Sequence, residues 1–191
     1  MAALNRETLE KMGFAEIGNN VMISEKASFY NCAKIKIGNN CRIDDFCVVA
    51  AGEGGVNIGR YVHIAVGSTL IGAGNIKLSD FSGLSSRVAI YSSSDDYSGA
   101  FMTNPTVPKQ FTNVKHADVY LDKHVIVGSG SVILPGVRLE EGVAIGALSL
   151  VTKSCKAFGI YAGNPAKFIK ERKRDLLALE QQLLNHKNNE S

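Results

Sequence analysis

Residues 119–151 read VYLDKHVIVGSGSVILPGVRLEEGVAIGALSLV and decide the fold. A period of six positions in this stretch fits neither a helix of 3.6 residues per turn nor a strand that alternates every second residue. It is typical of a parallel β-helix, in which three short strands form each turn and stacked turns bury one another's apolar side chains. The periodic residues are Leu121, Val127, Ile133, Leu139, Ile145 and Val151, with Val125, Ser131, Val137, Val143 and Ser149 four positions after the first five.

The same repeat extends over most of the chain and predicts an all-β domain built as a parallel β-helix of hexapeptide repeats. We expect a helical cap over residues 1–15, the β-helix over 16–160 with an inserted loop at 95–118, and a C-terminal helix over 161–191. Asn5 is expected to cap the first helix, and Pro165 to open the last one, which has an apolar stripe at Ile169, Leu176 and Leu183. The earlier repeats begin at Ile17, Ile23, Ile37, Ile43, Ile58, Ile64, Leu78 and Leu84.

Two glycine-containing features are predicted to form corners of the coil. The Gly-Asn-Asn triplets at 18–20 and 38–40 suit left-handed backbone angles, which glycine and asparagine tolerate best. The segment 50–55 (AAGEGG) is glycine-rich like a phosphate-binding loop, but no helix follows it, which favours a corner extension.

Composition excludes several classes of function. The 191 residues carry a formal net charge of +3, which indicates neither a nucleic-acid arm nor a membrane surface. Residues 1–15 are charged throughout and lack the apolar core of a signal peptide, so we expect a cytoplasmic protein with no membrane partner.

Cys41 and Cys47 fall on inward positions, and Cys32 and Cys155 lack metal-ligand spacing. Free structural thiols and no metal site are expected.

The repeat stops after Tyr91 and resumes only beyond His116. A solenoid that interrupts its repeat with a long loop often uses that loop for function, because the turns already provide stability. We therefore expect the acceptor site there, with Tyr97 and Phe101 as aromatic candidates for stacking on a sugar or base. The alternative is that these rings only anchor the loop.

Five parts of the sequence resemble hexapeptide-repeat acyltransferases. They are the repeats, the loop after Tyr91, 127–136 (VGSGSVILPG), 145–153 (IGALSLVTK) and 162–167 (AGNPAK). The similarity is to sugar acetyltransferases of the galactoside and maltose type, and most to N-acetyltransferases of dTDP-linked amino-dideoxy sugars such as dTDP-4-amino-4,6-dideoxyglucose. It implies a left-handed β-helix, a homotrimer, acetyl-CoA as co-substrate and a nucleotide-linked sugar acceptor used for O-antigen or capsule, as in lipopolysaccharide biosynthesis.

The resemblance also implies a path for acetyl-CoA between two subunits. By matching motif, Ser129, Ala147 and Thr152 would line the pantetheine arm, and small side chains there leave room for it. Cations would meet the nucleotide phosphates; the candidates are Lys153, Lys167 and Lys170, with Arg172, Lys173 and Arg174 nearby. A solvated basic face is the alternative for the last group.

The chain departs from the galactoside-type pattern at one position. Those enzymes have a histidine after the strand that matches 88–94, where it acts as general base for a sugar hydroxyl, and here the matching residue is Asp95. A hydroxyl needs a base as it attacks, whereas an unprotonated amine attacks a thioester readily and needs mainly positioning. We therefore expect N-acetylation, with Asp95 or Asp96 orienting the amine, and direct attack without an acetyl-enzyme.

The histidines leave alternatives open. His63 and His124 each precede an inward residue, so both are expected to face outward, where they either touch substrate or are ordinary surface residues. Zinc carbonic anhydrases also use this coil, but the intervals between His63, His116 and His124 do not resemble their ligand set. Two further readings remain: a sugar O-acetyltransferase, and a non-catalytic β-helix binding module.

Overall fold

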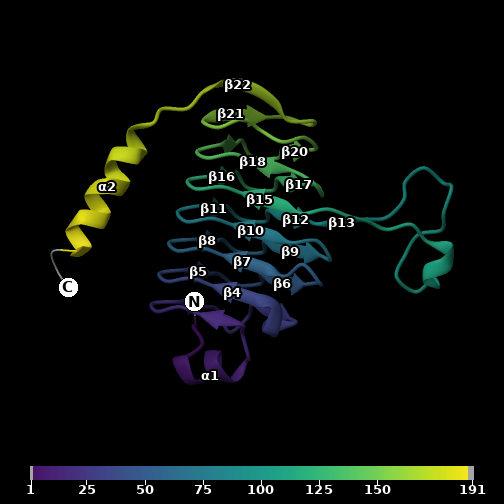
Figure 1. Ribbon diagram of the computed structural model, residues 1–191, viewed down its shortest axis with the longest axis horizontal. Helices are drawn as coiled ribbons and strands as arrows, with labels where there is room; N and C mark the ends of the chain where they lie inside the picture. Colours follow the sequence, from purple (N-terminus) through teal and green to yellow (C-terminus); the bar gives the residue numbers. More distant parts are fainter. Residues whose placement is uncertain (1, 189–191) are drawn as a thin grey trace.

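The computed structural model describes residues 2–188, which form a three-sided coil of about seven turns (Figure 1). Sheet 1 consists of β1 (Glu16–Ile17), β4 (Ile35–Ile37), β7 (Val56–Ile58), β10 (Ile76–Leu78), β15 (Val119–Leu121) and β18 (Arg138–Leu139). Sheet 2 consists of β2 (Met22–Ile23), β5 (Arg42–Ile43), β8 (His63–Ile64), β11 (Gly83–Leu84), β16 (Ile126–Val127), β19 (Ala144–Ile145), β21 (Gly159–Ala162) and β22 (Lys167–Glu171). Sheet 3 consists of β3 (Ser28–Tyr30), β6 (Val48–Ala51), β9 (Thr69–Gly72), β12 (Ala89–Tyr91), β17 (Val132–Ile133) and β20 (Leu150–Val151).

The repeated aliphatic residues form one column inside the coil. Along sheet 2, Ile43, Ile64 and Leu84 lie in register on successive strands and are at most 1% exposed. The residue before each of them points outward, as strand alternation requires. A single turn cannot bury such a row, so stability comes from stacking. The β-helix predicted from the six-residue period is therefore confirmed.

The corners between sheets 1 and 2 need left-handed backbone angles. Asn20 and Asn40 adopt them, with φ of 53° and 59°, as the Gly-Asn-Asn triplets predicted. Tyr61, Phe81 and His124 occupy the same corner in later turns with φ of 58° to 60°. Their rings stack on one another, at 4.9 Å between Tyr61 and Phe81 and 5.2 Å between Phe81 and His124. Stacking contacts thus offset a backbone conformation that such residues rarely adopt.

A short helix, α1 (Arg6–Lys11), covers the first turn of the coil. The Asn5 side chain accepts a hydrogen bond from the Thr8 N–H at 2.9 Å, which is the N-cap predicted from the sequence. Leu9 is the buried contact of the helix, at 2% exposure.

The C-terminal helix is present, but it begins later than predicted. Pro165 does not open it; the chain instead forms β22, which pairs antiparallel with β21 and covers the exposed edge of sheet 2. The helix α2 (Asp175–Asn188) then runs back beside the coil (Figure 1). Ile169 lies on β22, not on the helix, and Leu183 is exposed, so the predicted apolar stripe does not form the contact. Residue 1 and residues 189–191 of the two predicted end segments lie outside the described range.

The inserted loop leaves the coil after β12 and projects away from it (Figure 1). Two short strands, β13 (Ser93–Ser94) and β14 (Lys115–His116), pair antiparallel at its base. The loop contains one short helix, η2 (Lys109–Phe111), and another, η1 (Cys32–Lys34), lies at a corner near the start of the coil.

Cys41 and Cys47 are buried in the core as predicted, and all four cysteines are free. Burial raises the pKa of the Cys155 thiol to about 11, so it is unreactive at neutral pH. Between residues 2 and 188, no cluster of three or more His, Cys, Asp or Glu side chains could hold a metal ion. Neither α1 nor α2 is long and apolar enough to cross a membrane.

Candidate active site

Two adjoining hollows lie on the outer surface where sheet 2 turns into sheet 3. The first, here the His63 pocket, has a volume of about 280 Å³ and is lined by His63, Ala65, Gly83, Leu84, Ser85, Ser86, Ile126 and Ser129. The second, here the Ala147 groove, has a volume of about 510 Å³ and is lined by Arg87, Ser129, Gly130, Ala147 and Leu148. The two hollows share Ser129 in their lining and adjoin there. The predicted pantetheine residues Ser129 and Ala147 both line the Ala147 groove.

Ser129 lies between two glycines, Gly128 and Gly130. A side chain at Gly128 would lie 2.5 Å from the backbone nitrogen of Ala147, and Gly130 has φ of +70°. Both glycines are therefore required by the coil. The N–H groups of Ser86, Ser129 and Ala147 donate to no acceptor within residues 2–188. A buried ligand with carbonyl groups would find donors there.

His63 is held by a carboxylate on the neighbouring turn. Its Nε2 lies 2.8 Å from Asp44 Oδ2, and the Arg42 guanidinium donates to the other oxygen of Asp44 at 2.7 Å. Burial would raise the pKa of Asp44, but the hydrogen bonds from Arg42 and His63 outweigh it and hold that pKa below its usual value. An ionised carboxylate only accepts, so it fixes the proton on Nε2 and leaves the Nδ1 lone pair of His63 available.

The two loop carboxylates differ in their surroundings. Asp96 is buried and accepts hydrogen bonds from the Ser98 hydroxyl at 2.8 Å and from the Ser98 and Phe101 N–H groups at 3.2 Å. These bonds lower the pKa of Asp96 and tie its carboxylate to the shape of the loop. The carboxylate of Asp95 is half-buried and takes part in no hydrogen bond or ion pair with residues 2–188. Tyr97 is 92% exposed.

The loop and the two hollows lie on different corners of the coil. Asp95 follows sheet 3, whereas His63 and Ser129 lie on or after sheet 2, and neither hollow is lined by a loop residue. One subunit therefore does not bring the predicted catalytic carboxylates to the predicted coenzyme path.

The predicted phosphate ligands gather at the last turn. Thr152 and Lys153 directly follow β20, and Lys167 and Lys170 lie on β22, all exposed. None of these three lysines forms an ion pair within the described chain. Arg172 is different because its guanidinium donates to the carbonyls of His124 and Gly142 at 2.8 and 2.9 Å.

Arg174 also has a partner in the protein. Its guanidinium lies 4.5 Å from the centre of the Phe158 ring. Arg172 and Arg174 therefore contact the coil, whereas the phosphate role of the basic segment stays a prediction. The sequence showed their charge but not that the chain turns back over the coil here.

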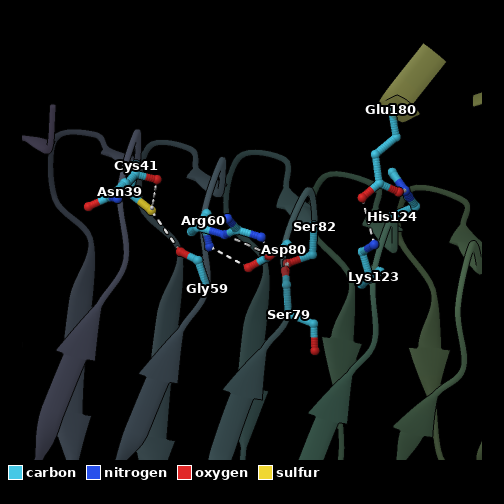
Figure 2. Close-up of polar contacts among 10 residues, drawn as sticks. All are labelled: Asn39, Cys41, Gly59, Arg60, Ser79, Asp80, Ser82, Lys123, His124 and Glu180. Carbon is cyan, nitrogen blue, oxygen red and sulfur yellow. Dashed lines mark hydrogen bonds and ion pairs between the residues drawn. The ribbon is translucent and has the colours of Figure 1, made fainter. Parts of the chain in front are cut away.

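The expectation for His124 needs a correction. His124 does face outward, but α2 covers it, so it is 9% exposed and lines neither hollow. Figure 2 shows Glu180 of α2 above this histidine, with its carboxylate 2.8 Å from His124 Nε2 and 2.6 Å from Lys123 Nζ. The sequence could not indicate this, because Glu180 lies 56 positions away.

Sequence reasoning missed Asp44, Ser85 and Ser86. A usable signal was present: successive turns of sheet 2 are about twenty residues apart, as the pairing of Arg42 with His63 shows. That interval places Arg42 directly beside His63, and Asp44, two positions after Arg42 on the same outward face, within reach of the His63 ring. Continued past the paired Leu84 and Val127, the register places Ser86 beside the predicted Ser129 once the inserted loop is allowed for.

Comparison with known proteins identifies relatives of this chain. It is 56% identical over 180 residues to a dTDP-4-amino-4,6-dideoxy-D-glucose acyltransferase of Escherichia coli, covering 94% of both chains. No family model matches the chain.

Solved structures show the same similarity. A variant of AntD, an N-acyltransferase from Bacillus cereus, in complex with dTDP-4-amino-4,6-dideoxyglucose and coenzyme A superimposes with a TM-score of 0.94. It is 45% identical, and the match covers 97% of this chain and 98% of AntD. Structures of AntD include replacements of one serine and of an aspartate ten positions after it. A maltose O-acetyltransferase from Clostridium difficile 630 has a TM-score of 0.54 at 21% identity over 88% of this chain and 75% of its own, which shows a shared fold alone.

Proposed function

The chain belongs to the hexapeptide-repeat β-helix family of acyltransferases, and we propose that it transfers an acyl group from coenzyme A to the amino group of dTDP-4-amino-4,6-dideoxyglucose. One observation carries the proposal: the 56% identity that extends over 94% of an acyltransferase named for this sugar. The complex of AntD with the same sugar nucleotide and coenzyme A supports it. Acetyl-CoA is the simplest donor, and the product would enter O-antigen or capsule synthesis.

The chemistry is a direct aminolysis of the thioester. The unprotonated sugar amine attacks the thioester carbonyl, and a tetrahedral intermediate with one oxyanion forms. A backbone N–H that has no acceptor in the chain, such as that of Ser129, donates to this oxyanion. The amine nitrogen loses its proton to Asp95 or to water, the C–S bond breaks, and the coenzyme leaves as a thiolate that takes up a proton. The products are an amide and the free thiol of coenzyme A.

Spacing along the chain selects Asp95 and Ser85 for this site. Ser85 with Asp95, and Ser86 with Asp96, reproduce the ten-residue interval between the serine and the aspartate replaced in AntD. Asp96 is already engaged within the loop, whereas Asp95 is free. We therefore assign Asp95 to the amine and Ser85, in the His63 pocket, to the acyl donor or sugar.

A homotrimer of left-handed coils would complete the site. The loop projects away from the coil (Figure 1) and contributes no residue to either hollow, so the Asp95 that serves one His63 pocket would come from a neighbouring subunit. The coenzyme would then lie between subunits, along Ser129, Ala147 and Thr152. Its phosphates would meet Lys153, Lys167 and Lys170, and the exposed ring of Tyr97 would reach the sugar nucleotide. The enzyme would work in the cytoplasm.

The first test is release of free thiol from acetyl-CoA with two acceptors that differ at one position. One is dTDP-4-amino-4,6-dideoxyglucose and the other its 4-hydroxy counterpart. Turnover with the amine alone, with an N-acetyl product by mass, is the expected result. Absence of turnover with both, together with no binding of acetyl-CoA in a thermal shift, would favour a non-catalytic binding module instead.

A second test addresses the loop carboxylate. Asp95→Asn should lower kcat about 100-fold, because a positioned carboxylate that accepts a proton contributes about that factor. The KM for acetyl-CoA should stay within about threefold. An unchanged kcat would remove Asp95 from the chemistry.

A second candidate function is O-acylation, and one observation favours it. His63 is held by Asp44 in the arrangement that prepares a histidine as general base. Turnover with the 4-hydroxy sugar that is lost in His63→Gln would establish this reading.

A further inference from the structure

Gly83 is unlike every other glycine of the chain. Each of the others has a φ between +69° and +146° or would place a side-chain carbon within 3.0 Å of a neighbouring atom. Gly83 has neither a left-handed φ nor a close neighbouring atom that would exclude a side chain. Its φ lies outside the left-handed region, and the nearest atom to an added Cβ is the His63 carbonyl oxygen at 3.9 Å. Glycine also has no side chain to pack on the sheet surface. Packing within residues 2–188 therefore gives no reason for glycine at this position.

The position of Gly83 shows where that space lies. Gly83 is in register with His63 on one side and Ile126 on the other, all facing outward on sheet 2. Both neighbouring side chains are exposed. Strands of a sheet are about 4.8 Å apart, so the two flanking residues enclose a notch about 10 Å wide. The notch forms part of the wall of the His63 pocket.

The notch also lies at the end of the coenzyme path. The Ala147 groove reaches the His63 pocket at Ser129, so a pantetheine arm that follows the groove would place its thioester there. Ala65 and Ile126 supply apolar surface to the pocket, and Ser85, Ser86 and Ser129 supply polar groups. This arrangement suits an aliphatic chain attached to a polar carbonyl.

We propose that the notch at Gly83 receives the acyl chain and sets the longest acyl group that the enzyme transfers, so that donors of about four carbons are accepted as well as acetyl-CoA. The inference rests on the proposed acyltransferase function. AntD has been solved with 3-hydroxybutyryl-CoA, which makes that thioester a suitable probe. A side chain at position 83 would occupy the volume of the chain beyond its second carbon and leave the acetyl position open.

The test compares acetyl-CoA, butyryl-CoA and 3-hydroxybutyryl-CoA as donors in the wild type, Gly83→Ala and Gly83→Val. In Gly83→Val, kcat/KM for the four-carbon donors should fall at least about tenfold relative to acetyl-CoA, the usual consequence of filling an apolar pocket by one or two carbons. In Gly83→Ala, the fall in kcat/KM for the four-carbon donors relative to acetyl-CoA should be smaller than in Gly83→Val. Both variants should fold, because within residues 2–188, apart from the two chain neighbours, the nearest atom to an added Cβ is the His63 carbonyl oxygen at 3.9 Å, and the position faces outward. Melting temperature and subunit assembly, measured by light scattering, should match the wild type.

A matched control variant enlarges a side chain in the same outward-facing column of sheet 2, but outside the His63 pocket. Ala144 neighbours Ile126 on the next strand and does not line the His63 pocket, so Ala144→Val should leave donor preference unchanged. Equal loss with all donors together with altered assembly would show that Gly83 serves a subunit contact and would overturn the proposal. An unchanged ratio would overturn it too. A wild type inactive with every donor would instead refute the proposed function itself.

Discussion

Two corners of the same coil have similar backbone angles but carry different side chains. The corner between sheets 1 and 2 carries Tyr61, Phe81 and His124, which stack on one another, and His124 also contacts Glu180 of α2. We call it the aromatic corner. The corner between sheets 2 and 3 has left-handed angles at Phe46, Gly67, Arg87, Gly130 and Leu148, so glycines alternate with larger residues, and the side chains of Phe46, Arg87 and Leu148 are exposed. We call it the open corner.

The difference shows that side chains, not backbone geometry, decide which corner is structural and which is available to ligands. In the aromatic corner, rings and the Arg60–Asp80 ion pair join successive turns, and the Glu180 contact adds the helix (Figure 2). In the open corner, Gly130 and Ala147 leave the Ala147 groove empty of protein atoms. Filling the open corner should therefore impair binding, and disrupting the aromatic corner should impair stability.

The largest effect is expected from a bulky residue in the open corner. Ala147→Leu should raise the KM for acetyl-CoA about 100-fold, or about 3 kcal/mol, because the side chain would occupy the coenzyme path. Ala147 is exposed, so the melting temperature should change little. Steady-state kinetics with varied acetyl-CoA measure the effect.

The same change at the aromatic corner provides the control. Ala157 precedes Phe158, with φ of 55°, just as Ala147 precedes Leu148, with φ of 57°. Ala157→Leu should leave the KM for acetyl-CoA within about twofold. If both variants bind the coenzyme normally, the path does not run through the open corner.

The next effect concerns how α2 is held. Glu180→Gln replaces a buried carboxylate that accepts from Lys123 and His124, and a hydrogen bond to a charged group contributes about 2 kcal/mol. Amide hydrogen exchange over residues 175–188 should therefore become about 30-fold faster, with kcat unchanged. Glu10→Gln, which removes an exposed ion pair of α1 with Arg6, is the control and should have little effect. Equal exchange in wild type and Glu180→Gln would show that other contacts hold the helix.

The contrast between the corners also explains what the sequence could predict. The core columns and the corners at Asn20 and Asn40 follow from local periodicity and from residue types that tolerate left-handed angles. The contact of Glu180 with His124 depends on a helix that returns over the coil, and no local pattern encodes that return. A motif predicted that Ser129 and Ala147 meet the coenzyme, and both residues line the Ala147 groove. The pairing of His63 with Asp44 joins two turns and required the turn length of about twenty residues.

A smaller effect should follow from acid. Burial would raise the pKa of Glu180, but hydrogen bonds from Lys123 and His124 outweigh it and hold the pKa below the ordinary 4.5. Because the pKa of Glu180 is lower in the docked helix than in the undocked one, its ionised carboxylate stabilises docking fully above pH 4.5. This contribution is lost as the pH falls through the lower pKa of the docked state. Exchange over 175–188, corrected for its intrinsic pH dependence, should therefore become faster as the pH falls below 4.5. Glu180→Gln should abolish that rise, and a rise that persists in this variant would assign it to another group.

The smallest effect is expected at the last turn, where the open corner meets exposed lysines. Lys167→Ala should raise the KM for acetyl-CoA about threefold at low salt, because a solvent-exposed cation beside a phosphate contributes at most about 1 kcal/mol. The effect should shrink as salt is raised, because at 1 M salt the attraction between exposed charges is screened beyond about 3 Å. Lys36→Ala, which removes an equally exposed and unpaired lysine from sheet 1, should change neither the KM nor its salt dependence. If the two variants behave alike at every salt concentration, the phosphates do not reach β22, and the coenzyme path must end before the last turn.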